Sequence, residues 1–235
     1  MRVVAVMPVS GRGELFPITI RRLTEQGIKV VAVCDTCEEF MLALDAGAVP
    51  MLLLEPVPLG EKWLRGLDFA RRQLPDAILL ASSSVWYTSG YIQSMLPYLE
   101  EYDYVGLEDM YAVDFRKTEK KLLYWGGYYN RRKGQSLGAG RLLSRRILDK
   151  VDWNICNPNL NSQFDFSVNK TLAKAGAKPY AVGMNHEKML KISCWKWKQL
   201  NSFFHLAQNP NAKFMDNPDE WLNQYFPEAL TLFHE

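Results

Sequence analysis

The chain has 235 residues, of which 48% are hydrophobic, and its formal net charge is +2 at neutral pH. This length and apolar content predict one sizeable domain with a real core. No run of about 18 apolar residues occurs, which excludes a membrane span, and four irregularly spaced cysteines exclude a disulfide scaffold. The start, MRVVAVMPVSGRG, is typical of a first strand and loop and not of a signal peptide, so we expect a cytoplasmic protein.

The first half of the chain alternates between short apolar runs and amphipathic segments. Continuous apolar strands between amphipathic helices predict a doubly wound, mostly parallel α/β sheet that is covered on both faces. Ligands of such sheets bind beyond the carboxyl ends of the strands. We expect strands at 2–7, 29–34, 49–54 and 77–81, and helices at 15–25, 38–46 and 60–74.

The second half is less regular and predicts a smaller mixed sheet. Residues from 186 onward are rich in Trp, Phe, Asn and Pro, and we expect them to wrap the core as short helices and coil. The expected organisation is therefore a main domain at 1–185 and an irregular, aromatic-rich extension at 186–235 that packs on it. We expect strands at 104–107, 110–115, 122–126 and 177–183, and helices at 141–150 and 163–175.

Polar residues follow the expected strands at their carboxyl ends. The loop that contains Pro8, Ser10 and Arg12 is suited to cradle a phosphate or hold a base, or else it is an ordinary strand-to-helix turn. Asp35 ends the second strand, a placement that suits a ribose or the polar edge of a base, or a helix N-cap. Lys62, in the first turn of the third helix, either reaches a diphosphate or is a solvated lysine.

Together these pieces resemble the GT-A glycosyltransferase fold, in particular family 2-like enzymes, and small glycosyltransferase-like proteins encoded by phages. The matching segments are the loop Pro8–Arg12, the acidic residue Asp35, the G-x-x-x-A-R helix Gly66–Arg72 and the metal-motif strand Asp76–Ser84. The resemblance covers about the first 180 residues.

The resemblance implies inverting transfer of a sugar from a nucleotide-sugar donor, a UDP-sugar above all, to a hydroxyl acceptor. Family 2 enzymes carry an acidic general base at the start of a later helix, and Asp165 in SQFDFSV is the candidate here. The residues expected to bind the donor are Pro8, Ser10, Arg12, Asp35, Lys62, Ser82, Ser83, Ser84 and Trp86.

The chain departs from the family at the D-x-D metal motif, where it has the serines Ser82–Ser84. Neutral hydroxyls are weak ligands for a hard divalent cation, so Mg or Mn is disfavoured and no residue is assigned to a metal. Lys62 and several arginines would then stabilise the leaving diphosphate. Two alternatives are a displaced metal ligand among Asp103, Asp109 and Asp114, and a fold that is kept for binding after the chemistry was lost.

The acceptor side is expected in the segment YWGGYYNRRKGQSLGAGRLLSRR, residues 124–146, which interleaves aromatic residues with arginines. This pattern suits base stacking and phosphate contacts, a stacked sugar beside a clamped diphosphate, or an exposed basic hairpin. With the phage resemblance it indicates a hydroxymethylated base in phage DNA as acceptor, and hence the host cytoplasm. The expected acceptor-binding residues are Trp125, Tyr128, Arg131, Arg132 and Arg141.

A nucleotidyltransferase shares this sheet layout and stays open as a different class of enzyme. Such enzymes carry a glycine-rich signature near the N-terminus followed by a lysine, and SGRGELFP, residues 10–17, is only a faint match.

Overall fold

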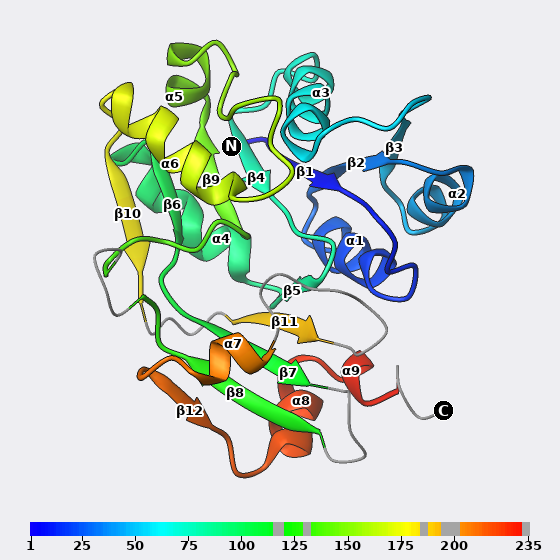
Figure 1. Ribbon diagram of the computed structural model, residues 1–235, viewed down its shortest axis with the longest axis vertical. Helices are drawn as coiled ribbons and strands as arrows, with labels where there is room; N and C mark the ends of the chain where they lie inside the picture. The colour runs from blue at the N-terminus through cyan, green and yellow to red at the C-terminus, as the bar shows by residue number, and fades with distance from the viewer. Residues whose placement is uncertain (115–119, 129–132, 184–187, 194–202, 232–235) are drawn as a thin grey trace.

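The structure is a computed structural model that describes residues 1–114, 120–128, 133–183, 188–193 and 203–231. Within these residues the strands form a seven-stranded sheet in the order β10-β6-β9-β4-β1-β2-β3 and a five-stranded sheet in the order β12-β8-β7-β11-β5 (Figure 1). This confirms the expected α/β class with a mostly parallel central sheet and a smaller mixed sheet.

The central sheet is parallel except at β9, which runs antiparallel to both β4 and β6. Because β1 lies between β2 and β4, the carboxyl ends of all three strands meet at one edge. The strands of this sheet are β1 (Val3–Pro8), β2 (Lys29–Cys34), β3 (Val49–Leu52), β4 (Ala77–Leu80), β6 (Tyr104–Leu107), β9 (Arg141–Ser144) and β10 (Pro179–Val182).

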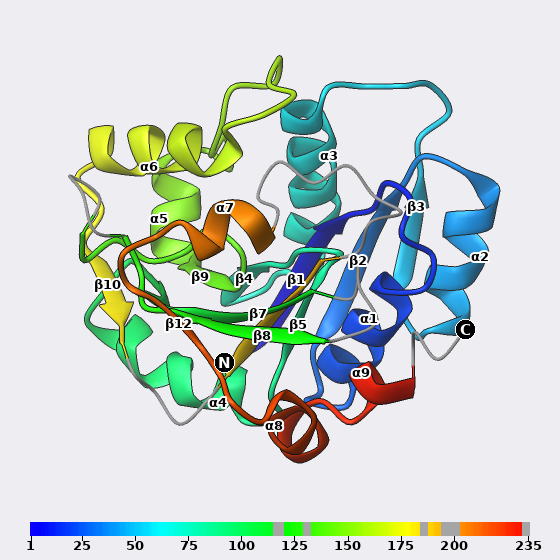
Figure 2. The ribbon, with the colours of Figure 1, turned by 60° about the horizontal axis from the view of Figure 1, so that its bottom comes forward.

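Helices cover both faces of the central sheet because successive side chains of each strand point to opposite faces. In β1, Ala5 and Met7 belong to one buried cluster, whereas Val4 and Val6 belong to the other. Figure 2 shows α3, α5 and α6 above the sheet and α1 and α4 below it. The helices are α1 (Phe16–Thr24), α2 (Cys37–Asp45), α3 (Leu59–Arg71), α4 (Tyr91–Met95), the 3₁₀ helix η1 (Leu96–Glu100), α5 (Arg145–Lys150) and α6 (Phe164–Lys174).

Gly66 explains the close packing of α3 on the sheet. A β-carbon at this position would lie 2.7 Å from side-chain methyl groups of both Val6 and Val33. The small residue therefore lets the helix approach β1 and β2, and Ala70, one turn later, is fully buried on the same face. The G-x-x-x-A-R segment is thus a helix-to-sheet packing motif in this chain.

The expected helix at 141–150 is wrong for its first four residues, which form β9. Leu142 and Leu143 are fully buried, and they pair with β4 on one side and β6 on the other. Ser144 ends the strand and caps the helix that follows, since its hydroxyl accepts a hydrogen bond from the amide of Ile147. A buried strand and a short helix are therefore joined without a loop.

The second sheet contains strands from the segment where we expected only short helices and coil. That expectation is wrong for β11 and β12, because Leu190 and Ile192 of β11 are buried against Leu222 and Phe226. β11 lies between β7 and β5, so the chain beyond residue 186 completes this sheet, and the boundary at 185 stays a prediction. The elements are β5 (Val85–Tyr87), β7 (Met110–Asp114), β8 (Lys121–Trp125), β11 (Met189–Ser193), α7 (Phe203–Ala207), β12 (Ala212–Phe214), α8 (Pro218–Tyr225) and α9 (Glu228–Thr231).

The part of the chain that the structure describes contains no helix with both the length and the apolar character that a membrane crossing requires.

Candidate active site

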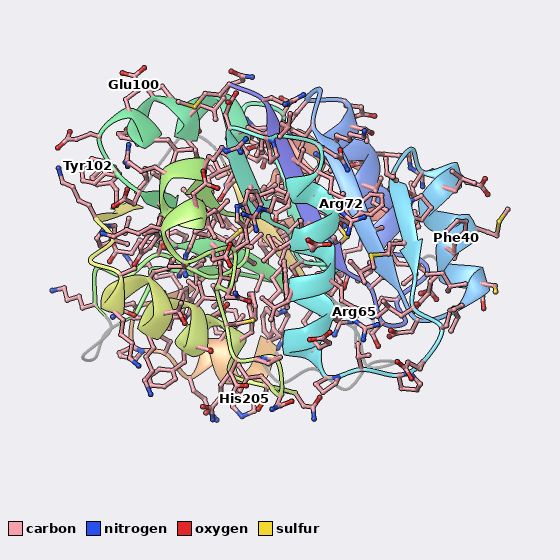
Figure 3. The ribbon with its side chains drawn as sticks, turned by 90° about the horizontal axis from the view of Figure 1, so that it is seen from above. Phe40, Arg65, Arg72, Glu100, Tyr102 and His205 are labelled. Atoms are coloured by element: carbon pink, nitrogen blue, oxygen red, sulfur yellow. The ribbon has the colours of Figure 1, made fainter. Side chains whose placement is uncertain are left out.

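A cavity of about 700 Å³ opens at the carboxyl ends of β1, β2 and β4. Its volume lies in the range that is typical of ligand sites. Residues of α3, α6, α7 and β11 complete its walls, and Figure 3 shows His205 of α7 between the N-terminal ends of α3 and α6. The residues expected from the sequence that line this cavity are Pro8, Ser10, Arg12, Asp35, Lys62, Ser82, Ser83, Trp125, Tyr128 and Asp165.

The loop after β1 is held by one buried carboxylate. Gly11 and Arg12 both have left-handed backbone angles, with φ of 63° and 64°. Glu39 accepts hydrogen bonds from the amides of Gly11 and Asp35, and its own amide is capped by the hydroxyl of Thr36. The carboxylate therefore ties the loop to the end of β2, and it occupies the Gly11 amide that was a candidate phosphate donor.

Lys62 and Asp35 form an ion pair at the edge of the cavity. The Nζ atom of Lys62 lies 2.6 Å from Oδ2 of Asp35, and it also donates a hydrogen bond to the carbonyl of Val9. The Lys62 side chain is only 5% exposed, whereas that of Asp35 is 38% exposed. Lys62 therefore has its charge compensated and fixes Asp35 at the cavity wall.

The N-terminus of α3 does not open toward the cavity with free amides. The amides of Gly60 and Glu61 donate to the carbonyls of Leu160 and Pro158 at distances of 2.8 Å. A β-carbon on Gly60 would overlap the carbonyl oxygens of Asn157 and Pro158. The segment 157–160 thus closes this helix end, so its dipole is not directed at a ligand through these two amides.

The serines that follow β4 are bonded to Arg12. Its Nη1 atom lies 3.4 Å from Oγ of Ser83 and 3.2 Å from Oγ of Ser84. Both serines are buried, and Ser82 beside them lines the cavity. Burial also lowers the pKa of the Arg12 guanidinium. The hydroxyls of Ser83 and Ser84 therefore hold an arginine at the strand end where the family pattern places metal-binding aspartates.

Lys191 is a site residue that sequence reasoning missed. It lies on β11, and its partners in the sheet are Val85 of β5 and Ala112 of β7. Met189 and Lys191 line the cavity, whereas Leu190 packs on the opposite side. The pKa of Lys191 is lowered to about 8, chiefly by burial and also by the charge of Arg12, whereas the Asp165 carboxylate acts to raise it. Lys191 therefore lies within the electrostatic reach of both residues.

The alternation in MLKIS, residues 189–193, was the signal that could have identified this strand. Apolar residues at 190 and 192 against Met189 and Lys191 are typical of a half-buried strand. His205 and Asn209, which also line the cavity, had no comparable signal in the sequence.

Asp165 enters the cavity from the first turn of α6. The helix start is positioned by Phe164, whose ring stacks on Trp63 of α3 with centroids 4.5 Å apart and planes 10° apart. The carboxylate lies against the backbone of Gly138, because a β-carbon there would overlap both Oδ1 and Cγ of Asp165. The acid is thus held between α6 and the segment that precedes β9.

Three expected site residues lie outside the cavity wall, and one of them is Ser84, which is buried against Arg12. The other two are Trp86 and Arg141. Trp86 is fully buried in the cluster behind the second sheet, where its ring packs against Phe226. Arg141 is also fully buried, and its guanidinium donates to the hydroxyl and carbonyl of Ser136 and to the side chain of Asn169. Both positions are corrections to the expectation of a ligand contact, since both side chains are used within the fold.

The acceptor-side segment reaches the cavity through two aromatic rings. Trp125 and Tyr128 both line it, and their rings meet edge to face with centroids 5.1 Å apart. Arg131 and Arg132 lie outside the described residues.

The donor atoms present do not fit a divalent metal ion. Buried Ser83 and Ser84 offer neutral hydroxyls that already accept hydrogen bonds from a guanidinium, and Lys191 adds a second cation on the same wall. Among the described residues, no three His, Cys, Asp or Glu side chains group together as ligands. A divalent cation here would meet two positive charges and no carboxylate cluster.

The three downstream aspartates do not supply the missing ligands. Asp103 pairs with Arg146 and accepts a hydrogen bond from the amide of Lys178, which lowers its pKa although burial opposes this. Asp109 accepts a hydrogen bond from the hydroxyl of Tyr124 at 2.7 Å. Neither these two nor Asp114 belongs to the described cavity lining, so a metal ligand displaced to these positions is not supported.

No protein-family model matches the chain, and no curated protein matches it. Solved structures do match. TarS from S. aureus in complex with UDP superposes with a TM-score of 0.60 at 15% identity, over 82% of this chain and 60% of that one. A structure of the same protein with UDP-GlcNAc gives 0.59 at 12% identity, over 95% of this chain and 64% of that one.

Glucosyl-3-phosphoglycerate synthase from Mycobacterium tuberculosis, in complex with Mn²⁺, UDP-glucose and phosphoglyceric acid, is also similar. Its TM-score is 0.52 at 12% identity, over 78% of this chain and 72% of that one. At such identities the likeness concerns the fold, and the chain spans less than two thirds of the TarS chains. We conclude that this protein has a GT-A-like fold, the fold of nucleotide-sugar transferases.

Proposed function

We propose that this protein is a glycosyltransferase that moves a sugar from a nucleotide-sugar donor, a UDP-sugar above all, to a hydroxyl acceptor. The observation that carries the proposal is that Asp35, Arg12 and Asp165 line one cavity at the carboxyl edge of the central sheet. This edge is where ligands of open α/β sheets bind. The fold shared with UDP-bound TarS supports a nucleotide-sugar as donor.

The donor's nucleoside is assigned to the wall formed by Asp35 and the Pro8–Arg12 loop. Asp35 is fixed by Lys62 yet is 38% exposed, so a carboxylate oxygen is available to a ribose or base donor group. Pro8 and Ser10 line the cavity beside it. Lys62 acts here as a positioning residue, since its ammonium group already contacts Asp35 and Val9.

The transfer step is assigned to Asp165. Its carboxylate takes the proton of the acceptor hydroxyl while the acceptor oxygen forms a bond to the anomeric carbon of the sugar. The bond between that carbon and the diphosphate oxygen breaks, and the nucleoside diphosphate leaves with the electron pair. Attack from the side opposite the leaving group inverts the anomeric centre. A positioned base in this role contributes roughly 100-fold or more to the rate.

A hydroxymethylated base in DNA is the acceptor that we propose. Trp125 and Tyr128 bring aromatic rings to the cavity, and rings of this kind stack on bases. The basic residues Arg131, Arg132 and Lys133 of this segment supply charge for a phosphate backbone. Arg141 is buried inside the fold, and Arg145 and Arg146 are paired with Asp149 and Asp103.

The test is a panel of nucleotide-sugars and their nucleoside diphosphates in a thermal shift assay, followed by transfer assays. Stabilisation by one donor and by its free diphosphate, together with sugar transfer to an acceptor, is the expected result. Transfer to hydroxymethylated but not to plain duplex DNA supports the DNA acceptor. Stabilisation by a donor without turnover on any acceptor would favour a nucleotide-sugar binding protein over an enzyme.

A further inference from the structure

Two cations from distant parts of the chain meet at the end of β4. Arg12 comes from the loop after β1, and its guanidinium rests on the hydroxyls of Ser83 and Ser84. Lys191 comes from β11, which is anchored beside the serines because the amide of Ile192 donates to the carbonyl of Ser84 at 3.0 Å. Both side chains line the same cavity.

Neither cation forms an ion pair with a carboxylate in the part of the chain that the structure describes, although Asp165 acts on Lys191 from farther away. No acidic oxygen there lies within salt-bridge distance of Arg12 or Lys191, in contrast to Lys62, whose ammonium group is paired with Asp35. Like charges held close together on a partly buried wall destabilise each other, and an anion between them removes that cost. The pKa of Lys191 is lowered chiefly by burial and also by the charge of Arg12.

The backbone at Arg12 is consistent with a functional constraint. A left-handed conformation is uncommon for a residue other than glycine, and at Arg12 it follows directly after a left-handed Gly11. In this conformation the guanidinium lies against Ser83 and Ser84, and the Glu39 contact to Gly11 holds the loop.

We propose, on the basis of the proposed function, that Arg12 and Lys191 bind the donor's diphosphate and together fill the role of a divalent cation. Arg12 is pre-oriented by Ser83 and Ser84, and Lys191 supplies a compact point charge from β11. When the bond to the anomeric carbon breaks, the added negative charge on the departing diphosphate develops next to these two cations. Donor binding and turnover are therefore independent of metal.

The experiment is titration calorimetry with UDP and UMP, in EDTA and in Mn²⁺, on the wild type, Lys191→Met, Lys191→Arg and Lys174→Met. Lys174 is exposed on α6 outside the cavity, so Lys174→Met removes the same charge at a position that does not contact the proposed ligand. We expect wild-type affinity for UDP to be equal in EDTA and in Mn²⁺. Lys191→Met should weaken UDP binding by roughly ten- to a hundredfold, weaken UMP binding less, and not lower the thermal midpoint.

The outcomes separate this inference from the proposed function. The role of Lys191 would be overturned if UDP binding required Mn²⁺, or if Lys191→Met bound UDP as tightly as Lys174→Met does. Neither result would contradict the proposed function as a nucleotide-sugar transferase. Recovery of affinity in Lys191→Arg would support a charge contact over a packing effect. If the wild type binds no nucleoside diphosphate, among UDP, CDP, GDP and ADP, the proposed function itself fails and this inference fails with it.

Discussion

The carboxylate of Asp165 lies directly against Gly138, at a distance that leaves no room for a β-carbon at position 138. The glycine belongs to the segment before β9 and the aspartate to the first turn of α6, so one close contact links the two. Asp165 is therefore held in place by a neighbour that lacks a side chain.

Gly138→Ala is expected to displace the Asp165 carboxylate without unfolding the protein. The overlapping atoms are at the end of an aspartate side chain, which can rotate, and Gly138 is not one of the positions with positive φ. A displacement of about 1 Å lowers a catalysed rate by roughly 100-fold. Steady-state kinetics should show this loss in kcat, with the thermal midpoint near that of the wild type. Gly183→Ala is the control, because its β-carbon meets only ordinary contacts; an equal loss there would refute the interpretation.

Asp165→Asn is expected to keep donor binding and to lose turnover. The amide has almost the same shape as the carboxylate but cannot accept the acceptor's proton, so kcat should fall by roughly 100-fold or more. Calorimetry with UDP should give an affinity within about threefold of the wild type, since Asp165 is assigned to the acceptor side of the cavity. Full activity in this variant would rule out Asp165 as the base.

Lys62 and Asp35 are expected to be energetically coupled. Lys62→Met removes the partner that fixes Asp35 and should lower the free energy of unfolding by about 1–3 kcal/mol, less than for a fully buried pair because Asp35 is partly exposed. Denaturant unfolding of Lys62→Met, Asp35→Asn and the double variant gives the interaction energy, expected at about 1 kcal/mol or more. Strictly additive effects would show that the pair does not act as a unit.

The affinity for UDP is expected to fall as the pH rises through about 8, where Lys191 loses its proton. The charged groups that act on Lys191 are Arg12 from the β1 loop, which favours loss of the proton, and Asp165 from α6, which opposes it. His205 of α7 lines the same cavity. Calorimetry between pH 7 and 9.5 should show the decline in the wild type and not in Lys191→Arg.

The stability of the ligand-free protein should rise with pH, whereas the affinity for UDP falls. The pKa of Lys191 is about 8 in the folded state and 10.5 in the reference state, so the unfolded chain binds the extra proton between these values. The free energy of unfolding contributed by this group therefore rises as the pH increases from 8 to 10.5. A wild-type curve parallel to that of Lys191→Met across this range would contradict the assignment.

The repeated apolar runs of the first half were sufficient to predict the four parallel strands β1 to β4 of the central sheet. In the strand 29–34 and in the helix around Gly66, the hydrophobic pattern, the segment length and the flanking turn residues all indicate the same secondary structure. The segment 141–150 was mispredicted because its first residues are helix-compatible, whereas burial between β4 and β6 determines their conformation. Tertiary pairing of this kind is not visible in a local pattern.

The candidate site was predictable only where one residue sits at the end of one predicted strand. Asp35 and the serines after β4 were found this way. Lys191 was missed because its strand is completed by partners about 80 and 100 residues earlier in the chain, β7 and β5. Trp86 was assigned to the donor by its position next to the serines, but the alternation of β5 turns its side chain into the core behind the sheet.

The most direct test of the account is sugar release and transfer by the purified wild type with UDP-sugars, in EDTA and in Mn²⁺, with Asp165→Asn as the negative control. The account predicts turnover that is undiminished in EDTA and lost in Asp165→Asn. Turnover that vanishes in EDTA and returns with Mn²⁺ would contradict it, because Arg12 and Lys191 would then not replace the metal.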